Sequence, residues 1–158
     1  MSALFAPRTF PDVHFHILRE QDIAAVSCVE SDVYAFPWSE GNFRDSLLAG
    51  YRCWGCWSGN ELIGYAILMI SIDEAHLLNL AVTKHWQRRG VGRHMLQFIM
   101  DEARKSHCVM LYLEVRPSNH AALRLYAATG FRQFGMRRDY YPAQDGRENA
   151  LFLGLELV

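Results

Sequence analysis

The sequence has few of the features that mark disulfide-built, membrane-spanning or nucleic-acid-binding proteins. Four cysteines among 158 residues are too few for a disulfide scaffold of this size. The longest apolar run, around residues 66–70, is far too short to cross a bilayer, and no charged leader with a long apolar stretch opens the chain. Sixteen basic and seventeen acidic side chains nearly cancel, so bulk charge favours neither nucleic acid nor an anionic membrane as a partner. We therefore expect a cytoplasmic protein with reduced thiols that binds neither nucleic acid nor membrane directly.

Patterns of metal ligands are also missing. The seven histidines show no spacing such as His-Glu-x-x-His, so we expect no metal. Cys53 and Cys56 have the spacing of a redox or zinc motif, yet no second cysteine pair accompanies them. Both fall in an expected strand, where alternation directs the two sulfurs to opposite faces. We interpret them as buried structural thiols.

What the chain does contain is an alternation of strand and helix patterns typical of one folded domain. Half of its residues are apolar, enough for one sizeable core at this length. We expect a single domain over residues 13–158, preceded by a lead-in over residues 1–12 without clear periodicity. The pattern predicts an α+β or α/β fold, a mixed sheet with helices on its faces. The expected strands cover residues 13–18, 51–57, 62–70, 74–82, 109–115, 131–140 and 150–157, with a polar hairpin loop over residues 142–149.

Four helices are expected between these strands. The first follows Asp22, whose side chain can cap it, and Ile23, Val26, Glu30 and Val33 share one of its faces. A proline after the first helix limits its length, because proline disfavours helical geometry in the residue before it. The remaining helices begin after Ser39, after residues 90–92 with an inner stripe of Val91, Met95, Ile99 and Ala103, and after Ser118 or Asn119, where Gly130 ends the last.

The segment over residues 87–93, Gln-Arg-Arg-Gly-Val-Gly-Arg, has the composition of a phosphate-binding turn between a strand and a helix. Its glycines allow a close backbone approach, and the first helical turn leaves N–H groups without partners and favours negative charge. Three arginines add charge-assisted donors. The segment lacks both the Gly-Lys-Ser/Thr ending of a Walker loop and the third glycine of a dinucleotide-binding turn. We predict an anion site here rather than a plain basic helix entry.

Two side chains could move protons, although the residues alone leave both roles open. Glu114 interrupts an otherwise apolar strand, on the face of Met110 and Tyr112. There it suits a general base and a water-facing glutamate equally well. Tyr126 lies just before the end of the last expected helix, where an aromatic residue more often simply fills the core. Pattern alone therefore assigns neither an acid nor a base.

Taken together, these motifs resemble the GNAT acetyltransferase family. The resemblance lies in Gln-x-x-Gly-x-Gly after a strand ending Leu-Ala-Val, in Leu-Glu-Val-Arg-x-Ser-Asn, and in Ala-x-x-Leu-Tyr before Gly-Phe. It implies a central, mostly antiparallel sheet flanked by helices, with acetyl-coenzyme A (acetyl-CoA) as cosubstrate. It also implies Glu114 as catalytic base and Tyr126 as catalytic acid. By the same resemblance, the cofactor-binding residues are Leu80, Ala81, Val82, Arg88, Arg89, Gly90, Val91, Gly92, Arg93 and Asn119.

Further segments are similar to one branch of that family, whose members acetylate the N-terminal alanine of a small-subunit ribosomal protein. They are Ala-Phe-Pro-Trp-Ser over residues 35–39, Tyr-Tyr-Pro over residues 140–142 and Asp-Gly-Arg-Glu over residues 145–148. The resemblance implies a protein N-terminus as the acceptor. The residues expected to contact that acceptor are Trp38, Tyr140 and Tyr141.

The last hairpin also suits a peptide on physical grounds. Tyr140 and Tyr141 offer rings that can flank a chain and hydroxyls that can meet its backbone. Asp145 and Glu148 could attract a cationic amine end or basic residues downstream of it. The competing interpretation is a plain surface hairpin with a proline turn.

Two other functions remain open. The first keeps the chemistry but changes the acceptor to a small amine, a polyamine or a lysine side chain. The second is a non-catalytic coenzyme A-binding module that acts through protein contacts. The presence of both Glu114 and Tyr126 disfavours the module. We expect a monomer or a weak homo-oligomer.

Overall fold

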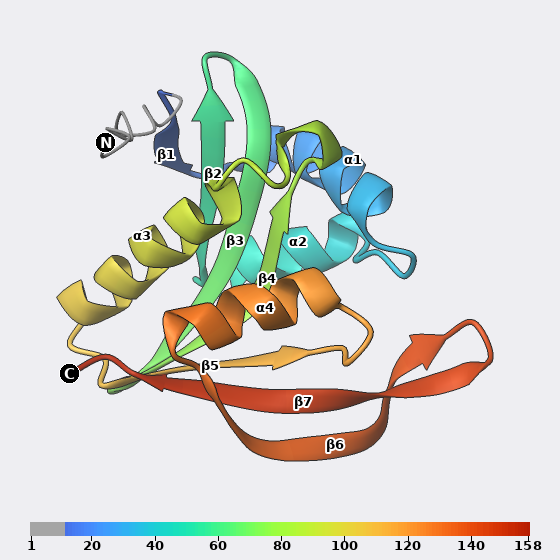
Figure 1. Cartoon of the computed structure of the whole chain (residues 1–158). Helices are drawn as coiled ribbons and strands as arrows, with labels where there is room; N and C mark the ends of the chain where they lie inside the picture. Colours follow the sequence, from blue (N-terminus) through green and yellow to red (C-terminus); the bar gives the residue numbers. More distant parts are fainter. Residues whose placement is uncertain (1–11) are drawn as a thin grey trace, which may run out of the picture.

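Figure 1 shows the computed structural model of the chain, which describes residues 12–158. A seven-stranded sheet runs through these residues in the order β1-β2-β3-β4-β5-β7-β6. Neighbouring strands are antiparallel except for β4 and β5, which are parallel. The expected mixed sheet is confirmed. Its strands are β1 (His14–Ile17), β2 (Arg52–Ser58), β3 (Glu61–Ser71), β4 (Glu74–Val82), β5 (Met110–Val115), β6 (Arg132–Ala143) and β7 (Gly146–Glu156).

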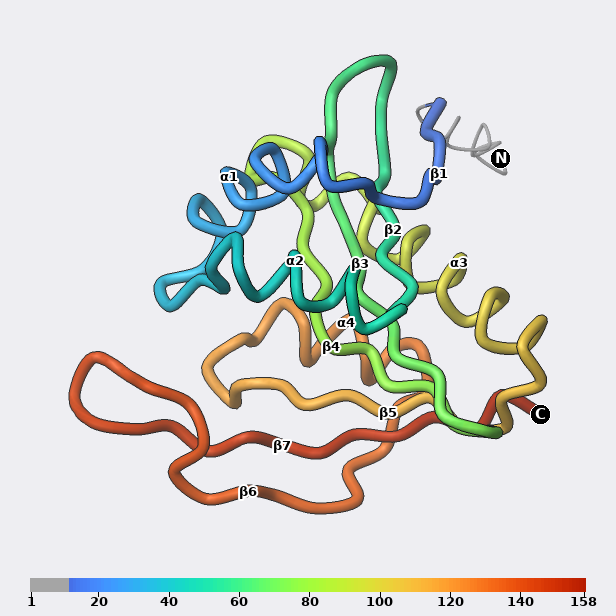
Figure 2. The backbone as a smooth tube through the Cα atoms, turned by 180° about the vertical axis from the view of Figure 1, so that it is seen from behind, coloured from blue at the N-terminus to red at the C-terminus, as the bar shows by residue number. Residues whose placement is uncertain are grey.

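Helices cover both faces of the sheet. Two of them, α3 and α4, lie in front of it in Figure 1, and Figure 2 shows α1 and α2 on the opposite face. This arrangement confirms the expected flanking of the sheet by helices. The helices are α1 (Ile23–Val33), α2 (Glu40–Leu48), α3 (Val91–Lys105) and α4 (His120–Thr129), with 3₁₀ turns η1 (Glu20–Asp22) and η2 (Lys84–Trp86).

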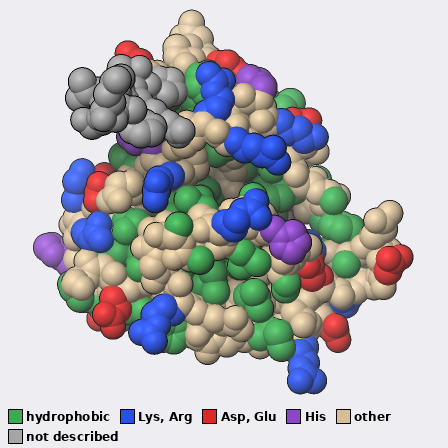
Figure 3. Space-filling model, viewed as in Figure 1, with side chains coloured by type: hydrophobic (Ala, Val, Ile, Leu, Met, Phe, Trp, Pro, Cys, Tyr) green, Lys and Arg blue, Asp and Glu red, His purple; other side chains and the backbone are tan. Residues whose placement is uncertain are grey.

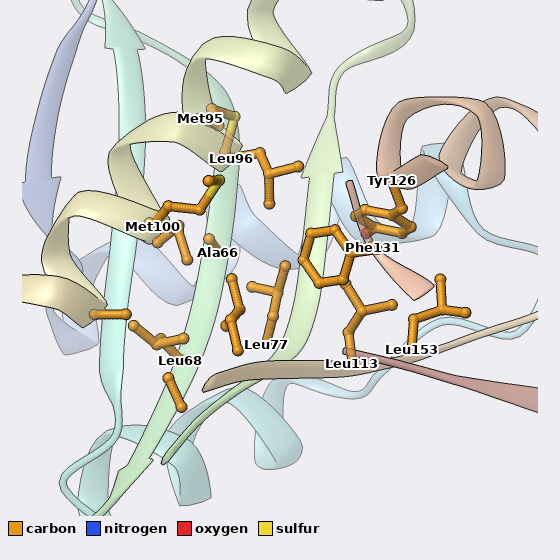
Figure 4. Close-up of a cluster of buried hydrophobic side chains, with 14 of the residues drawn as sticks. Ala66, Leu68, Leu77, Met95, Leu96, Met100, Leu113, Tyr126, Phe131 and Leu153 are labelled. Carbon is orange, nitrogen blue, oxygen red and sulfur yellow. The ribbon is translucent and has the colours of Figure 1, made fainter. Parts of the chain in front are cut away.

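Each face of the sheet has its own hydrophobic core, because successive strand residues point to opposite faces. The larger core lies under α3 and α4, and Figure 4 shows part of it. The smaller core lies under α1 and α2. Cys56 belongs to the larger core and Cys53 to the smaller, which confirms the expected orientation of the two sulfurs. The expected inner stripe of α3 is also buried: Val91, Met95, Ile99 and Ala103.

The helix termini near the site are capped much as expected. The Ser39 hydroxyl accepts a hydrogen bond from the Asn42 N–H at 3.1 Å and caps α2. The Asn119 side chain accepts one from the Ala122 N–H at 3.2 Å and caps α4. Gly130 ends α4 with a φ of 109°, a left-handed conformation that glycine adopts at little cost. These caps fix where α2 and α4 begin and where α4 ends.

The expected side-chain cap on α1 is wrong. Asp22 occupies the position before the helix, but its carboxylate accepts a hydrogen bond from the Arg19 N–H at 2.8 Å. The reason is that η1 runs directly into α1. The Ile23 N–H, at the start of the helix, therefore already bonds to the carbonyl of Glu20.

A bulge in β4 opens the sheet between β4 and β5. Ile67 pairs with Asn79 and Leu68 pairs with Leu77, so Leu78 is an extra residue in β4. β4 pairs with β5 only over the four residues before this bulge. Beyond it the two strands diverge, as Figure 1 shows. The later part of β4 therefore has an open backbone edge on its β5 side.

The last hairpin is longer than expected, and the predicted polar loop over residues 142–149 is wrong. β6 and β7 stay paired as far as Ala143 and Gly146, which leaves two residues in the turn. Pro142 is compatible with a strand here because β6 is at the edge of the sheet, where an outward N–H has no partner to lose. Polar composition in this segment reflects exposure rather than a loop.

The predicted lead-in over residues 1–12 lies outside the described residues, apart from Asp12. From residue 12 to residue 158, no helix is both long and apolar enough to cross a membrane. The same part of the chain contains no group of three or more His, Cys, Asp or Glu side chains placed to hold a metal ion.

Candidate functional site

Two adjoining cavities lie between β4, the end of α1, the start of α4 and the β6–β7 hairpin. The larger has a volume of about 960 Å³ and reaches the loop before α3. The smaller has a volume of about 270 Å³ and reaches the end of β5. The two cavities meet at residues that line both: Tyr34, Phe36, Leu80, Arg116, Asn119 and Tyr126.

The loop before α3 has the backbone geometry of an anion site. Arg88 and Gly90 both adopt left-handed conformations, with φ of 60° and 85°. Alternation of this kind gathers successive N–H groups into a concave turn, and α3 begins after Gly90 without a side-chain cap. Of the residues expected to bind phosphate, Arg88 and Gly92 line the larger cavity. A left-handed arginine is strained, and such strain is concentrated at functional sites.

The other residues of this loop are placed differently. The guanidinium carbon of Arg89 lies 4.2 Å from the centroid of the Trp86 ring. Val91 is buried in the larger core. Gly90, Val91 and Arg93 do not line the larger cavity with their side chains or backbone, as far as residues 12–158 show. Their contact with a phosphate stays a prediction.

β4 forms one wall of the larger cavity. Leu80, Ala81 and Val82 all line it, as do apolar residues of α4. The Val82 carbonyl accepts a hydrogen bond from the Gln87 side chain at 2.9 Å, which ties the loop to the strand. The Tyr34 hydroxyl donates to the Leu80 carbonyl. An apolar wall with backbone polar groups suits a ligand that carries both methylene and amide groups.

The residues present fit acetyl-CoA, the cosubstrate that the family resemblance implies. A volume of about 960 Å³ is at the upper end of the range for small-molecule sites. One end offers the turn before α3 with Arg88, and the side offers the open edge of β4. In Figure 3, Lys and Arg side chains lie around a hollow on the face that carries α3 and α4. This combination suits a long ligand with a charged diphosphate at one end.

Glu114 lies in the smaller cavity, at the end of β5. Burial alternates along β5, and the side chain of Glu114 shares the less buried face with Met110 and Tyr112, as expected. Its Oε1 atom lies 3.3 Å from Nε of Arg137 on β6, and its side chain is 23% exposed. The carboxylate is therefore held by a counter-ion at the edge of the cavity.

Tyr126 lies at the junction of the two cavities, although most of it is in the core. Its ring packs against Phe131, with centroids 5.3 Å apart, and Figure 4 shows the two side by side. Burial, followed by the proximity of Tyr141, raises the pKa of the Tyr126 hydroxyl far above its ordinary value. Among residues 12–158 the hydroxyl has no hydrogen-bond partner. A protonated phenol is thus available to a ligand.

The three residues expected to bind the acceptor are not equivalent. Trp38 and Tyr141 line the smaller cavity, whereas Tyr140 does not. The Tyr141 ring lies 4.4 Å from the guanidinium carbon of Arg116, and burial, followed by the proximity of Glu114, raises the pKa of Tyr141 to about 12. Tyr140 is 43% exposed and packs edge-on against Tyr141. Its contact with an acceptor stays a prediction.

Glu148 is already occupied by partners within the protein. Its carboxylate accepts hydrogen bonds from the Ser118 N–H at 2.8 Å, the Ser118 hydroxyl at 2.9 Å and Arg116 at 3.2 Å. Desolvation acts to raise its pKa, but the bonds from Ser118 and Arg116 outweigh it and hold the pKa below the ordinary value. Glu148 therefore braces the hairpin, and its attraction for a basic peptide stays a prediction.

Three residues of the site were not singled out from the sequence. Arg116 donates to the Pro142 carbonyl at 2.7 Å and to Glu148, so it connects β5 to the hairpin. Tyr34 lines both cavities from the end of α1. Glu30 is buried and lines the smaller cavity. A signal existed only for Glu30, which is the one charged residue on the apolar face predicted for the first helix.

Comparison with known proteins agrees with this geometry. The chain is 39% identical over 140 residues to the [ribosomal protein bS18]-alanine N-acetyltransferase of Escherichia coli strain K12, covering 89% of this chain and 95% of the relative. It is 35% identical over 126 residues to the N-alpha-acetyltransferase RimI of Mycobacterium tuberculosis, covering 74% of this chain and 78% of the relative.

The fold leads to the same family. The crystal structure of the ribosomal-protein-S18-alanine N-acetyltransferase from Escherichia coli superposes with a TM-score of 0.87 and 37% identity, covering 92% of this chain and 94% of that one. A family model described as acetyltransferase (GNAT) family matches residues 18–131. The expected family is thereby confirmed, and this chain belongs to the GNAT acetyltransferases.

Proposed function

We propose that the protein transfers an acetyl group from acetyl-CoA to the N-terminal α-amine of a protein, with the N-terminal alanine of a small-subunit ribosomal protein as its acceptor. The observation that carries this proposal is the meeting of two cavities at Tyr126, one reaching the anion-binding loop and the other Glu114. A donor and an acceptor can approach one point from two sides. The acceptor is proposed from the names of the relatives, which are similar over most of the chain.

The donor is held by charge at one end and by the strand edge along its arm. Arg88 and the backbone of residues 89–93 bind the diphosphate through N–H groups and the positive end of α3. Leu80, Ala81 and Val82 lie against the pantetheine arm, and Asn119 contacts it further along. Acetyl-CoA, when bound, supplies an activated thioester to the junction of the cavities.

Glu114 and Tyr126 move the protons. Glu114, directly or through a water, takes a proton from the acceptor ammonium and frees its nitrogen for attack. As the new C–N bond forms and the C–S bond breaks, Tyr126 donates to the departing sulfur. The nitrogen sheds its second proton as the amide forms, and this proton restores the phenol. The raised pKa of Tyr126 keeps the proton on its oxygen until negative charge develops on sulfur.

The acceptor enters through the smaller cavity. Trp38 and Tyr141 flank its first residues, and the cavity volume of about 270 Å³ limits the size of the side chain next to the amine. Tyr140, more exposed, contacts residues further along the peptide. A small first residue such as alanine fits this space better than a large one.

The experiment that tests the proposal is acetylation of matched acceptors, followed by mass spectrometry. We expect turnover on a peptide that begins with alanine and little on its N-terminally blocked form, on free lysine or on polyamines. Intact small-subunit ribosomal proteins should gain one acetyl group at the N-terminus. Faster turnover on lysine or a polyamine would instead support the small-amine function. Binding of acetyl-CoA without acetylation of any acceptor would support a non-catalytic module.

A further inference from the structure

One buried carboxylate beside the cavities has no part in the proposed proton transfers. Glu30, in the last turn of α1, is 2% exposed and also lines the smaller cavity. Burial of a charged carboxylate is unfavourable unless hydrogen bonds replace its water. The residues that supply those bonds show what Glu30 holds together.

Both oxygens of Glu30 are used. Oε1 accepts a hydrogen bond from the Trp38 N–H at 3.2 Å. Oε2 accepts one from the Asn79 side chain at 3.1 Å and another from the Tyr65 hydroxyl. Burial, followed by the proximity of Glu30, raises the pKa of Tyr65 well above its ordinary value, so its hydroxyl keeps the proton that it donates.

Two of these donors, Trp38 and Asn79, belong to different segments that line the smaller cavity. Trp38 lies on the proposed acceptor side and belongs to the segment over residues 34–39, which joins α1 to α2. Asn79 lies in β4 directly after the bulged residue Leu78 and also lines the smaller cavity. The next residue, Leu80, lines both cavities, and β4 continues along the larger one. A single carboxylate therefore joins the segment over residues 34–39 to β4, the strand proposed to hold acetyl-CoA, at the place where β4 leaves β5.

We propose that Glu30 is a positioning residue that holds the segment over residues 34–39 at a fixed separation from β4, so that the acceptor amine meets the thioester. This inference rests on the proposed function. Glu30 acts through the backbone of Trp38 and through Asn79, and it touches neither the diphosphate nor the departing sulfur. Its two oxygens already accept three hydrogen bonds from within the protein, whereas among residues 12–158 Glu114 has Arg137 as its ion-pair partner.

The test begins with Glu30→Gln. Glutamine has the same shape, but its amide NH₂ group is a donor and cannot accept a hydrogen bond. It would therefore face a donor at one of the two positions where a carboxylate oxygen now accepts. We expect the KM for the acceptor peptide to rise about tenfold, as for loss of a hydrogen bond to a charged group. The Kd for acetyl-CoA should stay within about twofold, and the shape of the pH–rate profile should not change.

Hydrogen exchange supplies a readout that does not depend on activity. In Glu30→Gln the backbone amides of residues 34–39 should exchange faster with deuterium, since the Trp38 N–H loses its acceptor. Ser46→Ala is the matched control. Ser46 is also buried, but its hydroxyl bonds within α2 to the Asn42 carbonyl, and it lines neither cavity. Its variant should keep the wild-type KM and the wild-type exchange over residues 34–39.

A milder variant covers the case in which Glu30→Gln does not fold. Tyr65→Phe removes one donor and should raise the peptide KM in the same direction by a smaller factor. An unchanged peptide KM in a folded variant overturns the inference, as does a shifted pH profile, which would make Glu30 a proton acceptor. If the wild type acetylates no peptide, the proposed function fails, and exchange over residues 34–39 still decides the role of Glu30.

Discussion

Single residues at the junction of the cavities combine burial with a chemically useful group. Tyr126 is packed into the larger core, yet it also lines both cavities. Burial keeps the phenol protonated through neutral pH, because the phenolate would be poorly solvated. The same packing that stabilises the fold therefore fixes the position and the protonation state of the proposed acid.

Replacement of Tyr126 by phenylalanine tests this role. Tyr126→Phe keeps the ring and its contact with Phe131 but removes the donor to sulfur. We expect kcat to fall by about 100-fold or more, the usual contribution of a general acid. The Kd for acetyl-CoA, measured by calorimetry, should stay within about twofold.

Tyr112→Phe is the matched control for that variant. Tyr112 stacks on Phe152 and lines neither cavity, so its variant should retain wild-type turnover. If Tyr126→Phe and Tyr112→Phe have equal kcat values, Tyr126 is only a packing residue.

At the residue scale, the sequence already pointed to residues that line the cavities, through Glu114 in an apolar strand and Gly92 in the glycine-containing loop. It gave no sign that Arg137 pairs with Glu114 or that Arg116 occupies Glu148. Those contacts join residues that are far apart in the chain. From its charge alone, Glu148 was expected to attract a peptide, whereas in the fold its carboxylate is hydrogen-bonded to Arg116 and Ser118.

Elements of the fold contribute properties that no single side chain has. The start of α3 offers N–H groups and a positive dipole end, and Arg88 and Gly92 place this helix start beside the larger cavity. The β6–β7 hairpin closes the opposite side through Arg116 and Glu148. The site is thus assembled from one helix start, one open strand edge and one braced hairpin.

A methyl group at residue 92 tests the role of the α3 start. It would lie 3.5 Å from Leu125 and 3.9 Å from Val82, which is ordinary contact. Alanine also favours a helix over glycine by up to about 1 kcal/mol, so the free energy of unfolding of Gly92→Ala should not fall. Because Gly92 lines the larger cavity, we expect acetyl-CoA affinity to drop about tenfold, the result of a 1–3 kcal/mol overpacking penalty.

Calorimetry and urea unfolding measure the two effects of this variant. Gly41→Ala, inside α2 and away from both cavities, is the control. It should gain stability without any change in acetyl-CoA affinity. Equal affinities in the two variants would show that the α3 start does not approach the ligand.

The hairpin brace predicts a pH dependence. The pKa of Glu148 is lower in the folded protein than its ordinary value of 4.5, so its bonds add stability above that pH. This contribution is lost as the pH falls through the lowered value. Glu148→Gln should therefore reduce the free energy of unfolding by about 1–2 kcal/mol at pH 7 and by much less near pH 3.

Urea unfolding of both proteins at the two pH values checks this dependence. Asp145→Asn, at the turn of the same hairpin, is a control, because Asp145 makes none of these bonds. A stability difference between wild type and Glu148→Gln that is constant with pH would contradict the ionised brace.

The molecule as a whole has two cores, one on each face of a single sheet. The reactivity of the cysteines shows whether both cores are closed, because each core contains a buried cysteine. Cys28 is exposed, whereas the other three are buried, and burial raises the pKa of the Cys53 and Cys56 thiols to about 11. A folded molecule should therefore expose one reactive thiol out of four.

A thiol-specific disulfide reagent at pH 8 tests that arrangement. We expect one thiol per chain to react quickly and three to react only after unfolding in guanidinium. Cys28→Ser should abolish the fast phase. Two or more fast thiols in the wild type would mean that one of the cores is open.

The sequence by itself determined the periodic elements of the fold, the caps at Ser39 and Asn119, and the position of the glycine-containing loop before α3. These features depend on residues within one or two turns of each other, so their pattern is visible along the chain. It also predicted the family and its fold. It misplaced the end of the last hairpin, because a polar edge strand and a polar loop have the same composition.

Only the tertiary structure decided which polar groups meet. Glu30 and Asn79 are 49 residues apart, Tyr34 and Leu80 are 46 apart, and each pair is joined by a hydrogen bond. Such bonds form because the sheet bulges at Leu78 and α1 ends beside β4. The identity of the residues that bond predicts neither feature. The separation of the two sides of the site is therefore a property of packing, which no local pattern contains.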